Sequence, residues 1–301
     1  MAFKRLYLPK ENIYIPSSLK TDDEGFTWLA NLWEITKQSK SYSLDFQNTN
    51  WFEANLCAIL GAIITLRTDE GCHFSVCNIK SNQLNQTLSN NGFLSLFKNG
   101  DRTSTKNSSI PFQQFDMTNE EEVEKYIYEH VLLSERVPEM SEQAKKKVFR
   151  SIFEMYQNSV MHSGADNLFV CGQFYFHKRR MALTMVEFGR TFKENVARHN
   201  EAFKDYSGLK AIEWAVISGN TTKKAEETGG LGLDLIREFL QMNEGKLQIR
   251  SADGYWEEKK GVNFAKDCTN QFSGSVVNIE FNLRDENIYY AKEEIDPNSL
   301  F

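Results

Sequence analysis

The chain has little proline and no long apolar run, and each shortage excludes a class of protein. Only 5 prolines and 17 glycines stand among 301 residues, which excludes collagen-like and low-complexity chains. No window approaches 18 consecutive apolar residues, and the opening residues "MAFKRLYLPKENIYIP" lack the apolar core of a signal peptide. We therefore expect a cytoplasmic protein with no membrane partner.

Cysteine is also scarce, and its number is odd. The chain has 5 cysteines, most of them inside apolar or strand-like runs: Cys57, Cys72, Cys77, Cys171 and Cys268. This usage predicts buried free thiols in a reducing compartment rather than a disulfide framework. Cys72, His73 and Cys77 have no second pair at ligand spacing, so we expect no metal site there.

The charge balance argues against a dedicated nucleic-acid-binding protein. The net charge is -6, and the lysines and arginines are spread along the chain. We expect no nucleic-acid partner, although a local basic groove stays open. The composition is that of a globular protein, and the length suits about two domains.

The first part of the chain predicts a small α/β domain over residues 1–115. Residues 41–46 alternate as a strand, and the segment "WFEANLCAILGAIITLR" has apolar residues at helical spacing. A second strand is expected at 73–79 and a helix within 82–97. The polar stretch 98–109 then predicts a boundary or an exposed loop.

Residues 116–140 predict a connecting helix. Thr118 and Glu121 have the spacing of a capping box, and the helix is expected to last to about residue 134 before Pro138. A second domain is expected over 141–301.

The second domain is expected to begin with a long helix. Ser141 can cap this helix, which is expected to reach residue 163 with Val148, Ile152, Met155 and Val160 facing inward. Strand-like runs at 168–176 and 181–187 follow, joined by a basic turn, 177–180. A long connection with one helical piece, 208–217, then leads to a glycine-rich turn, a helix and two more strands.

Three polar residues lie on one face of the expected helix in "FRSIFEMYQNSVMHSGA". Glu154 and Asn158 are four residues apart, and His162 lies one turn further on. A carboxylate beside an amide oxygen suits Mg²⁺ that also holds phosphates, and the carboxylate can act as a base. The alternative is a solvated helix face.

Two further stretches carry chemistry. In "ETGGLGLDLI", Gly229, Gly230 and Gly232 lead into an amphipathic helix, where backbone N–H groups can approach a phosphate; the alternative is a helix entry used for packing. In "VEFGRTFKENV", Glu187 ends an apolar strand and Gly189 lets the chain turn. Such a carboxylate can accept a hydrogen bond from an exocyclic amine such as that of adenine, or it is an ordinary strand-end charge.

These stretches, in this order, resemble the GHKL ATPase family, which includes the gyrase B subunit, MutL, histidine-kinase catalytic domains and anti-sigma kinases. The resemblance covers roughly residues 141–283. It implies a two-layer α/β sandwich, with a mixed, mostly antiparallel sheet covered by helices on one face. It also implies ATP and Mg²⁺ as cofactors.

The resemblance implies a role for each matching residue. Asn158 matches the asparagine that coordinates Mg²⁺, Glu154 the general base, and Glu187 with Gly189 the adenine-reading acid and the glycine after it. The segment 190–228 corresponds to the ATP lid, and Lys223 or Lys224 is expected near a terminal phosphate. The remaining cofactor-binding residues implied are His162, Thr228, Gly229, Gly230, Leu231 and Gly232.

The chain departs from the family pattern at two positions. Glu187 replaces an aspartate, and Thr191 stands where a second glycine is usual. A longer acid can still accept the hydrogen bond if its strand sits slightly back, whereas Thr191 removes backbone freedom at the start of the lid.

The N-terminal half resembles a STAS-like domain more faintly. Ala54 and Asn55 stand near the position of a phosphorylatable serine and have no hydroxyl, so the resemblance implies a docking domain; an unrelated α/β domain is the alternative. We expect a Mg-ATP-binding switch with slow hydrolysis that acts on a protein partner. A kinase acting in trans, an interaction protein with a vestigial ATP site, and a homodimer stay open.

Overall fold

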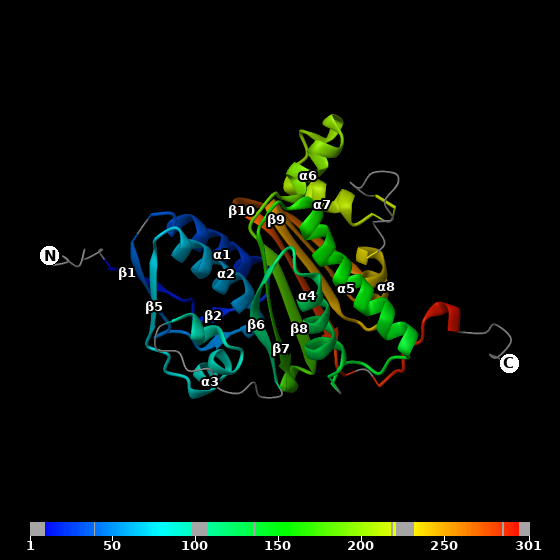
Figure 1. Cartoon of the computed structure of the whole chain (residues 1–301), viewed down its shortest axis with the longest axis horizontal. Coiled ribbons are helices and arrows are strands. Elements are labelled where there is room, and N and C mark those ends of the chain that lie inside the picture. The colour runs from blue at the N-terminus through cyan, green and yellow to red at the C-terminus, as the bar shows by residue number, and fades with distance from the viewer. Residues whose placement is uncertain are drawn as a thin grey trace.

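The described residues form a mixed α/β structure with two larger sheets and one short two-stranded sheet (Figure 1). The structure is a computed structural model that describes residues 10–38, 40–97, 108–134, 136–217, 219–220, 232–284 and 286–294. An N-terminal parallel sheet with its helices is followed by a five-stranded antiparallel sheet with helices, which confirms the expected α/β class.

The N-terminal part is built on three parallel strands, in the order β1-β3-β5. Parallel neighbours need a crossover connection, and helices supply it here. The strands are β1 (Lys10–Tyr14), β3 (Ser41–Asp45) and β5 (His73–Cys77), and two short strands, β2 (Ser18–Leu19) and β4 (Trp51–Phe52), pair separately. The helices are α1 (Asp23–Ile35), α2 (Cys57–Asp69) after the turn η1 (Ala54–Leu56), and α3 (Asn82–Asn90) before η2 (Phe93–Leu96). The strands and helices expected in this half are therefore confirmed.

The larger sheet has the order β6-β7-β8-β10-β9, and every neighbouring pair is antiparallel. Its strands are β6 (Ser109–Asp116), β7 (Asn167–Tyr175), β8 (Arg180–Glu187), β9 (Lys246–Lys259) and β10 (Val262–Asn282). The expected antiparallel character is thus confirmed, and the expectation of mixed strand directions is wrong for the described strands. Strand β6 begins before the expected boundary at residue 115, yet it pairs with β7, so it belongs to this second sheet.

Helices cover one face of this sheet and one of its ends (Figure 1). The face is covered by α4 (Glu120–Ile127), which continues as a π-helical turn (Tyr128–Leu132), α5 (Glu142–His162) and α8 (Gly232–Met242). Two short helices, α6 (Phe192–His199) and α7 (Gly208–Ala215), stand at the end where β8 finishes. The short turns are η4 (Phe176–Lys178), η5 (Glu201–Phe203) and η6 (Lys292–Glu294).

Helix starts follow local capping, with one shift from the expected pattern. Ser141 caps α5 by accepting from the N–H of Ala144, as predicted. The capping box expected at Thr118 is wrong, because Asn119 is the cap of α4 and the Thr118 hydroxyl donates to Asp116 instead. Val160, expected to face inward, is 38% exposed near the end of α5.

The N-terminal half covers the other face of the large sheet. Phe169, Val186 and Val276 belong to one buried cluster with the residues of α1 and α2, while Ile152 and Ile236 belong to the cluster on the opposite face. Helix α2 is buried along most of its length because the sheet lies on one side of it and the N-terminal strands on the other. The sheet is therefore covered on both faces, in contrast to the one-sided covering that the resemblance implied.

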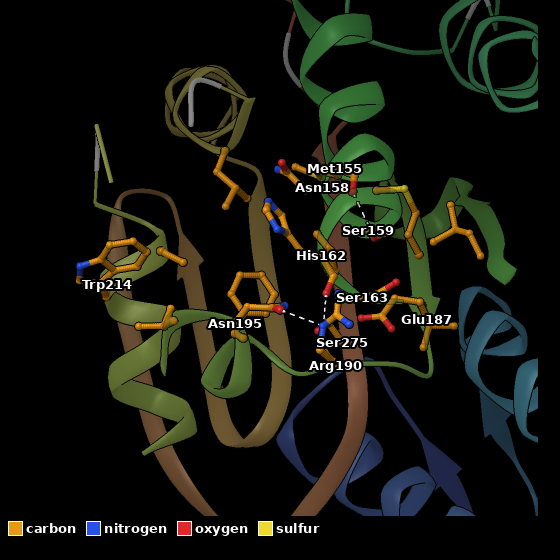
Figure 2. A pocket seen from close by; sticks show the side chains of 18 of the residues that line it. Met155, Asn158, Ser159, His162, Ser163, Glu187, Arg190, Asn195, Trp214 and Ser275 are labelled. Carbon is orange, nitrogen blue, oxygen red and sulfur yellow. Dashed lines mark hydrogen bonds between the residues drawn. The ribbon is translucent and has the colours of Figure 1, made fainter. Parts of the chain in front are cut away.

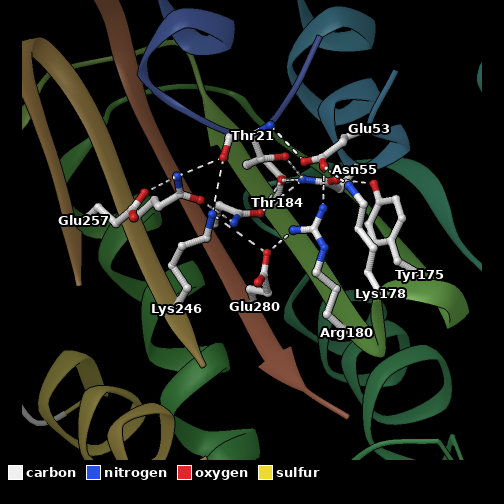
Figure 3. Close-up of polar contacts among 12 residues, drawn as sticks. Thr21, Glu53, Asn55, Tyr175, Lys178, Arg180, Thr184, Lys246, Glu257 and Glu280 are labelled. Carbon is white, nitrogen blue, oxygen red and sulfur yellow. Dashed lines mark hydrogen bonds and ion pairs between the residues drawn. The ribbon is translucent and has the colours of Figure 1, made fainter. Parts of the chain in front are cut away.

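A buried polar network joins the two halves (Figure 3). Asn55 Nδ2 lies 2.9 Å from Thr21 Oγ1 and 2.8 Å from Thr184 Oγ1, and Asn55 Oδ1 accepts from the hydroxyl of Tyr175 at 2.7 Å. Glu53 accepts from the N–H of Thr21 at 2.9 Å. Because buried polar groups are costly when unpaired, this network specifies how the halves dock.

The cysteines are free thiols, as the sequence predicts. Cys57, Cys72 and Cys171 are buried, Cys77 and Cys268 are partly buried, and all five are free thiols. Within the part of the chain that the structure describes, no helix combines the length and apolarity needed to cross a membrane.

Candidate functional site

A cavity of about 120 Å³ lies where α5 and β8 end and α6, α7 and α8 approach them (Figure 2). Its walls are partly apolar, with Met185, Val186, Val196 and Leu233 among the lining residues. Its polar groups come from α5, from the segment after β8, and from β10. An apolar cavity with a few convergent polar groups is the usual form of a small-molecule site.

Two of the three polar residues expected on α5 line this cavity. Asn158 and His162 are among the lining residues and are half-buried, and Figure 2 shows both on the cavity side of α5. Glu154 lies one turn earlier on the same helix and is also half-buried, but it is not among the described lining residues. The structure therefore brings the amide and the imidazole into the site, whereas the proposed base is not among the described lining residues.

Glu187 provides a buried carboxyl group at the cavity wall. It ends β8 and is 3% exposed, and its Oε2 atom has no hydrogen-bond partner among the described residues. Burial raises the pKa of Glu187 to about 8, and the nearby Ser275, the backbone of Gly189 and Arg190 offset only part of that rise. An unpaired buried acceptor is costly, so this atom marks a position where a donor from a ligand would be stabilising.

Gly189 allows β8 to end directly against the end of α5. A Cβ atom at this position would lie 2.5 Å from the carbonyl oxygen of Ser163 and 2.9 Å from Glu187 Oε2. The next residue secures the approach, because the N–H of Arg190 donates to the same Ser163 oxygen at 2.7 Å. The expected glycine is thus needed for close packing beside the carboxyl group.

Arg190 places a cation in the cavity that the sequence analysis missed. Its Nε atom donates to the carbonyl oxygen of His162 at 2.8 Å and lies 3.4 Å from Asn195 Oδ1 (Figure 2). Its position directly after the acid-x-Gly pattern was the available signal. The guanidinium group ties the segment after β8 to the last turn of α5.

Thr191 is the N-cap residue of α6. Its hydroxyl accepts from the N–H of Glu194 at 3.3 Å, and the Glu194 carboxylate accepts from the N–H of Thr191 at 2.7 Å. This reciprocal pair is a capping box that begins α6. A residue that departs from the glycine of the family pattern therefore starts a helix at the beginning of the expected lid.

The described second part of the expected lid, 208–217 and 219–220, is anchored to β9. The N–H of Gly208 donates to Asp253 Oδ1 at 2.7 Å, and a Cβ atom at Gly254 would lie 2.4 Å from the Gly208 carbonyl carbon. Trp214 and Asn220 line the cavity from this segment, and Asn220 Nδ2 donates to the Trp214 carbonyl oxygen at 2.8 Å.

Most of the expected phosphate-binding segment lies outside the described residues. These positions are Lys223, Lys224, Thr228, Gly229, Gly230 and Leu231. Gly232 begins α8, and the next residue, Leu233, lines the cavity. The start of α8 therefore lies at the site. This is the helix that the glycine-rich pattern predicts.

Ser275 and Asn195 are further lining residues that sequence reasoning missed. Ser275 is paired with Glu187 in the register between β10 and β8, which brings it beside the carboxyl group. For Ser275, the small residues at the start of "GSVVNIEF" were the only sequence signal. Local periodicity does not show that two strands so far apart in sequence pair with each other.

The described residues hold no group of three or more His, Cys, Asp or Glu side chains that could bind a metal ion alone. A cation at this site would need ligands from a bound anion in addition to the Asn158 amide oxygen. Comparisons with protein-family models and with curated proteins found no match to the chain. The site's own geometry therefore carries the functional argument.

Proposed function

We propose that this cavity binds the adenine nucleotide of Mg-ATP and that the protein is a nucleotide-dependent switch acting on a protein partner. The carrying observation is the buried Glu187 carboxyl group, whose Oε2 has no partner among the described residues, in a cavity that Asn158 and His162 also line. These residues, the strand-end acid-x-Gly pattern and the start of α8 support the GHKL resemblance together.

Glu187 would accept a hydrogen bond from the exocyclic amine of adenine. The group is buried, so the amine would gain a strong acceptor and the Oε2 atom would gain the partner that it lacks among the described residues. Because the amine donates, binding favours the ionised carboxylate and lowers the pKa of Glu187 from about 8.

Asn158 would supply a neutral oxygen ligand to Mg²⁺, with the phosphates as the other ligands. Bound Mg²⁺ would neutralise phosphate charge and polarise the terminal phosphoryl group. The start of α8 favours an anion, because helix N-termini present unpaired N–H groups and a positive dipole end.

Hydrolysis depends on Glu154, which we propose as the base that orients or deprotonates a water molecule. Glu154 is not among the described lining residues of the cavity, which favours slow turnover. The same observation supports a second candidate, an interaction protein that binds the nucleotide without hydrolysing it. Transfer of the phosphoryl group to a protein partner would use the same residues.

The docked N-terminal half gives the switch a route to a partner. Strand β8 carries Glu187 at the cavity and Thr184, which bonds Asn55 of the N-terminal half. Ligand binding can shift how the two halves dock only if the ligand binds one docked arrangement more tightly than another. Strand β8, which contacts both the cavity and the N-terminal half, would carry that difference.

Thermal unfolding with and without Mg-ATP tests the proposal. A ligand at a hundredfold excess over its Kd stabilises the native state by about 2.7 kcal/mol. We expect wild-type protein to show this shift, and Asn158→Ala to lose the part that depends on Mg²⁺. Glu154→Ala should keep the shift and lose phosphate release.

The matched control is Ser159→Ala, which changes a neighbouring cavity residue on α5 whose hydroxyl bonds within its own helix. It should keep both the shift and the phosphate release. No shift in wild-type protein would refute nucleotide binding, whereas a shift without phosphate release in wild type would select the binding-only candidate.

A further inference from the structure

A second cavity lies at the other end of β8 and concentrates positive charge. Arg180, the first residue of β8, lines it, whereas Glu187, the last, lines the first cavity. This second cavity, here called the basic cavity, has a volume of about 670 Å³. Seven lysine and arginine side chains line it against two glutamates, although the whole chain has a net charge of -6.

The deepest cations are held in place by the buried Glu53 and the partly buried Glu280. Arg180 forms ion pairs with Glu53 and Glu280, and its side chain is 13% exposed. Lys246 is 9% exposed and lies 3.8 Å from the Glu280 carboxylate. Figure 3 shows these groups converging between the N-terminal half and the sheet. Such burial fixes the side chains, so less conformational entropy is lost when they bind an anion.

The cations at the rim are not neutralised by the described residues. Arg179, Lys259 and Arg284 are exposed and form no ion pair with another described side chain. Lys260 is paired only with Glu244, and both of these side chains are more than half exposed. Residues of the basic turn 177–180 thus lie beside the two ends of β9 and the end of β10. Their positive charges together make the basic cavity electropositive.

The lining also indicates which anions suit this hollow. Met242 is its one apolar residue, and no aromatic side chain is among the described lining residues. Peptide partners are usually anchored by buried apolar or aromatic side chains, and single-stranded nucleic acids by stacking of bases on aromatic rings. Neither anchor is present, whereas lysine and arginine together recognise phosphate groups well.

We propose that the basic cavity binds a compact anion that carries several phosphate groups. The buried Arg180 and Lys246 form the floor of the site, and Lys259, Arg179 and Arg284 close around the anion from the rim. The site is separate from the nucleotide cleft, since the two share no lining residue. It would therefore exist whether or not the first cavity binds ATP.

Calorimetric titration with inorganic tripolyphosphate tests this site. The test variant combines Lys259→Gln with Arg284→Gln, because both side chains are exposed and their loss should leave the fold intact. We expect the variant to bind at least about tenfold more weakly than wild type, since two close charge–charge attractions are lost. Wild-type affinity should also fall steeply as salt is raised.

The matched control removes the same charge elsewhere, with Lys37→Gln and Lys145→Gln, two lysines outside the cavity that form i,i+3 pairs. It should bind tripolyphosphate as wild type does, and equal weakening in control and test variants would overturn the proposal. The same titrations in Asn158→Ala protein separate the two cavities. In this background we expect Lys259→Gln with Arg284→Gln to weaken tripolyphosphate binding by the same factor of about ten. Tighter binding of a single-stranded oligonucleotide that displaces tripolyphosphate would show that nucleic acid is the ligand class instead.

Discussion

Asn55 Nδ2 and Thr184 Oγ1 lie 2.8 Å apart, and this contact joins the N-terminal half of the chain to the central strand of the large sheet. Asn55 is fully buried. It stands near the position at which the STAS-like resemblance would place a phosphorylatable serine. The structure gives this position a packing role against the second sheet.

Replacing Asn55 should weaken the joint between the halves. Asn55→Ala leaves Tyr175, Thr184 and Asn278 with fewer partners in a buried site, and we expect a loss of about 2–4 kcal/mol in the free energy of unfolding. Urea unfolding measures the loss. Asn85→Ala, at an exposed position of α3, is the control and should change stability little. Equal midpoints for Asn55→Ala and wild type would contradict this account of the network.

The buried Glu187 should make stability depend on pH in a specific window. Its pKa is about 8 in the folded protein and near 4.5 when unfolded, so the folded state holds the proton more tightly. Its contribution is therefore fully present below pH 4.5 and is lost as pH rises through about 8. We expect the free energy of unfolding of wild-type protein to fall by a few kcal/mol relative to that of Glu187→Gln as pH rises over this range. Chemical denaturation at several pH values measures the difference, and a constant difference from pH 5 to 9 would show that Glu187 is not desolvated.

Glu187 should also confer base selectivity if the first cavity binds a nucleotide. Adenine presents an amine where hypoxanthine presents a carbonyl oxygen. Above pH 8, where the Glu187 carboxyl group is ionised, it can only accept, so it should favour the amine over the oxygen. We expect ATP to bind at least about tenfold more tightly than inosine triphosphate, a difference of about 1.4 kcal/mol. In Glu187→Ala the preference should disappear. Binding competition against a fluorescent adenine nucleotide measures it, and equal affinities in wild type would remove the adenine-reading role.

Thr191 should contribute to stability through the capping box of α6. Thr191→Ala removes the side-chain acceptor for the N–H of Glu194, and the expected cost is about 1 kcal/mol. Thr191→Ser keeps the hydroxyl and should stay near wild type. Thermal unfolding of the three proteins checks this difference. If Ala and Ser variants unfold together, the hydroxyl does not stabilise the helix.

The local elements were predictable because their causes are local. Alternation placed strands at 41–46, 168–176 and 181–187, and helical spacing with the Ser141 cap placed α5. The shifted cap at Asn119 shows the limit of such patterns, since two adjacent polar residues can each begin the helix and their hydrogen-bond partners decide.

Local sequence patterns also pointed to some residues of the two cavities and missed others. Spacing placed Asn158 and His162 on one helix face, and the resemblance joined Glu187 to them; the structure brings all three to one cavity. Ser275 was missed because its approach depends on pairing between strands far apart in sequence. Arg190 and Asn195 were missed because they reach the cavity only when the segment after β8 folds back against the end of α5. The basic cavity was invisible for the same reason, as its cations come from three separated segments and the chain as a whole is acidic.

By itself the sequence determined several of the helices and strands and the chemical character of the residues along them, because periodicity, caps and turn residues act over a few positions. Only the tertiary structure decided that β6 joins the second sheet, that the N-terminal half covers its other face, and that two cavities of opposite character lie at the two ends of β8. These features depend on which surfaces bury one another, and burial is a property of the whole packed chain.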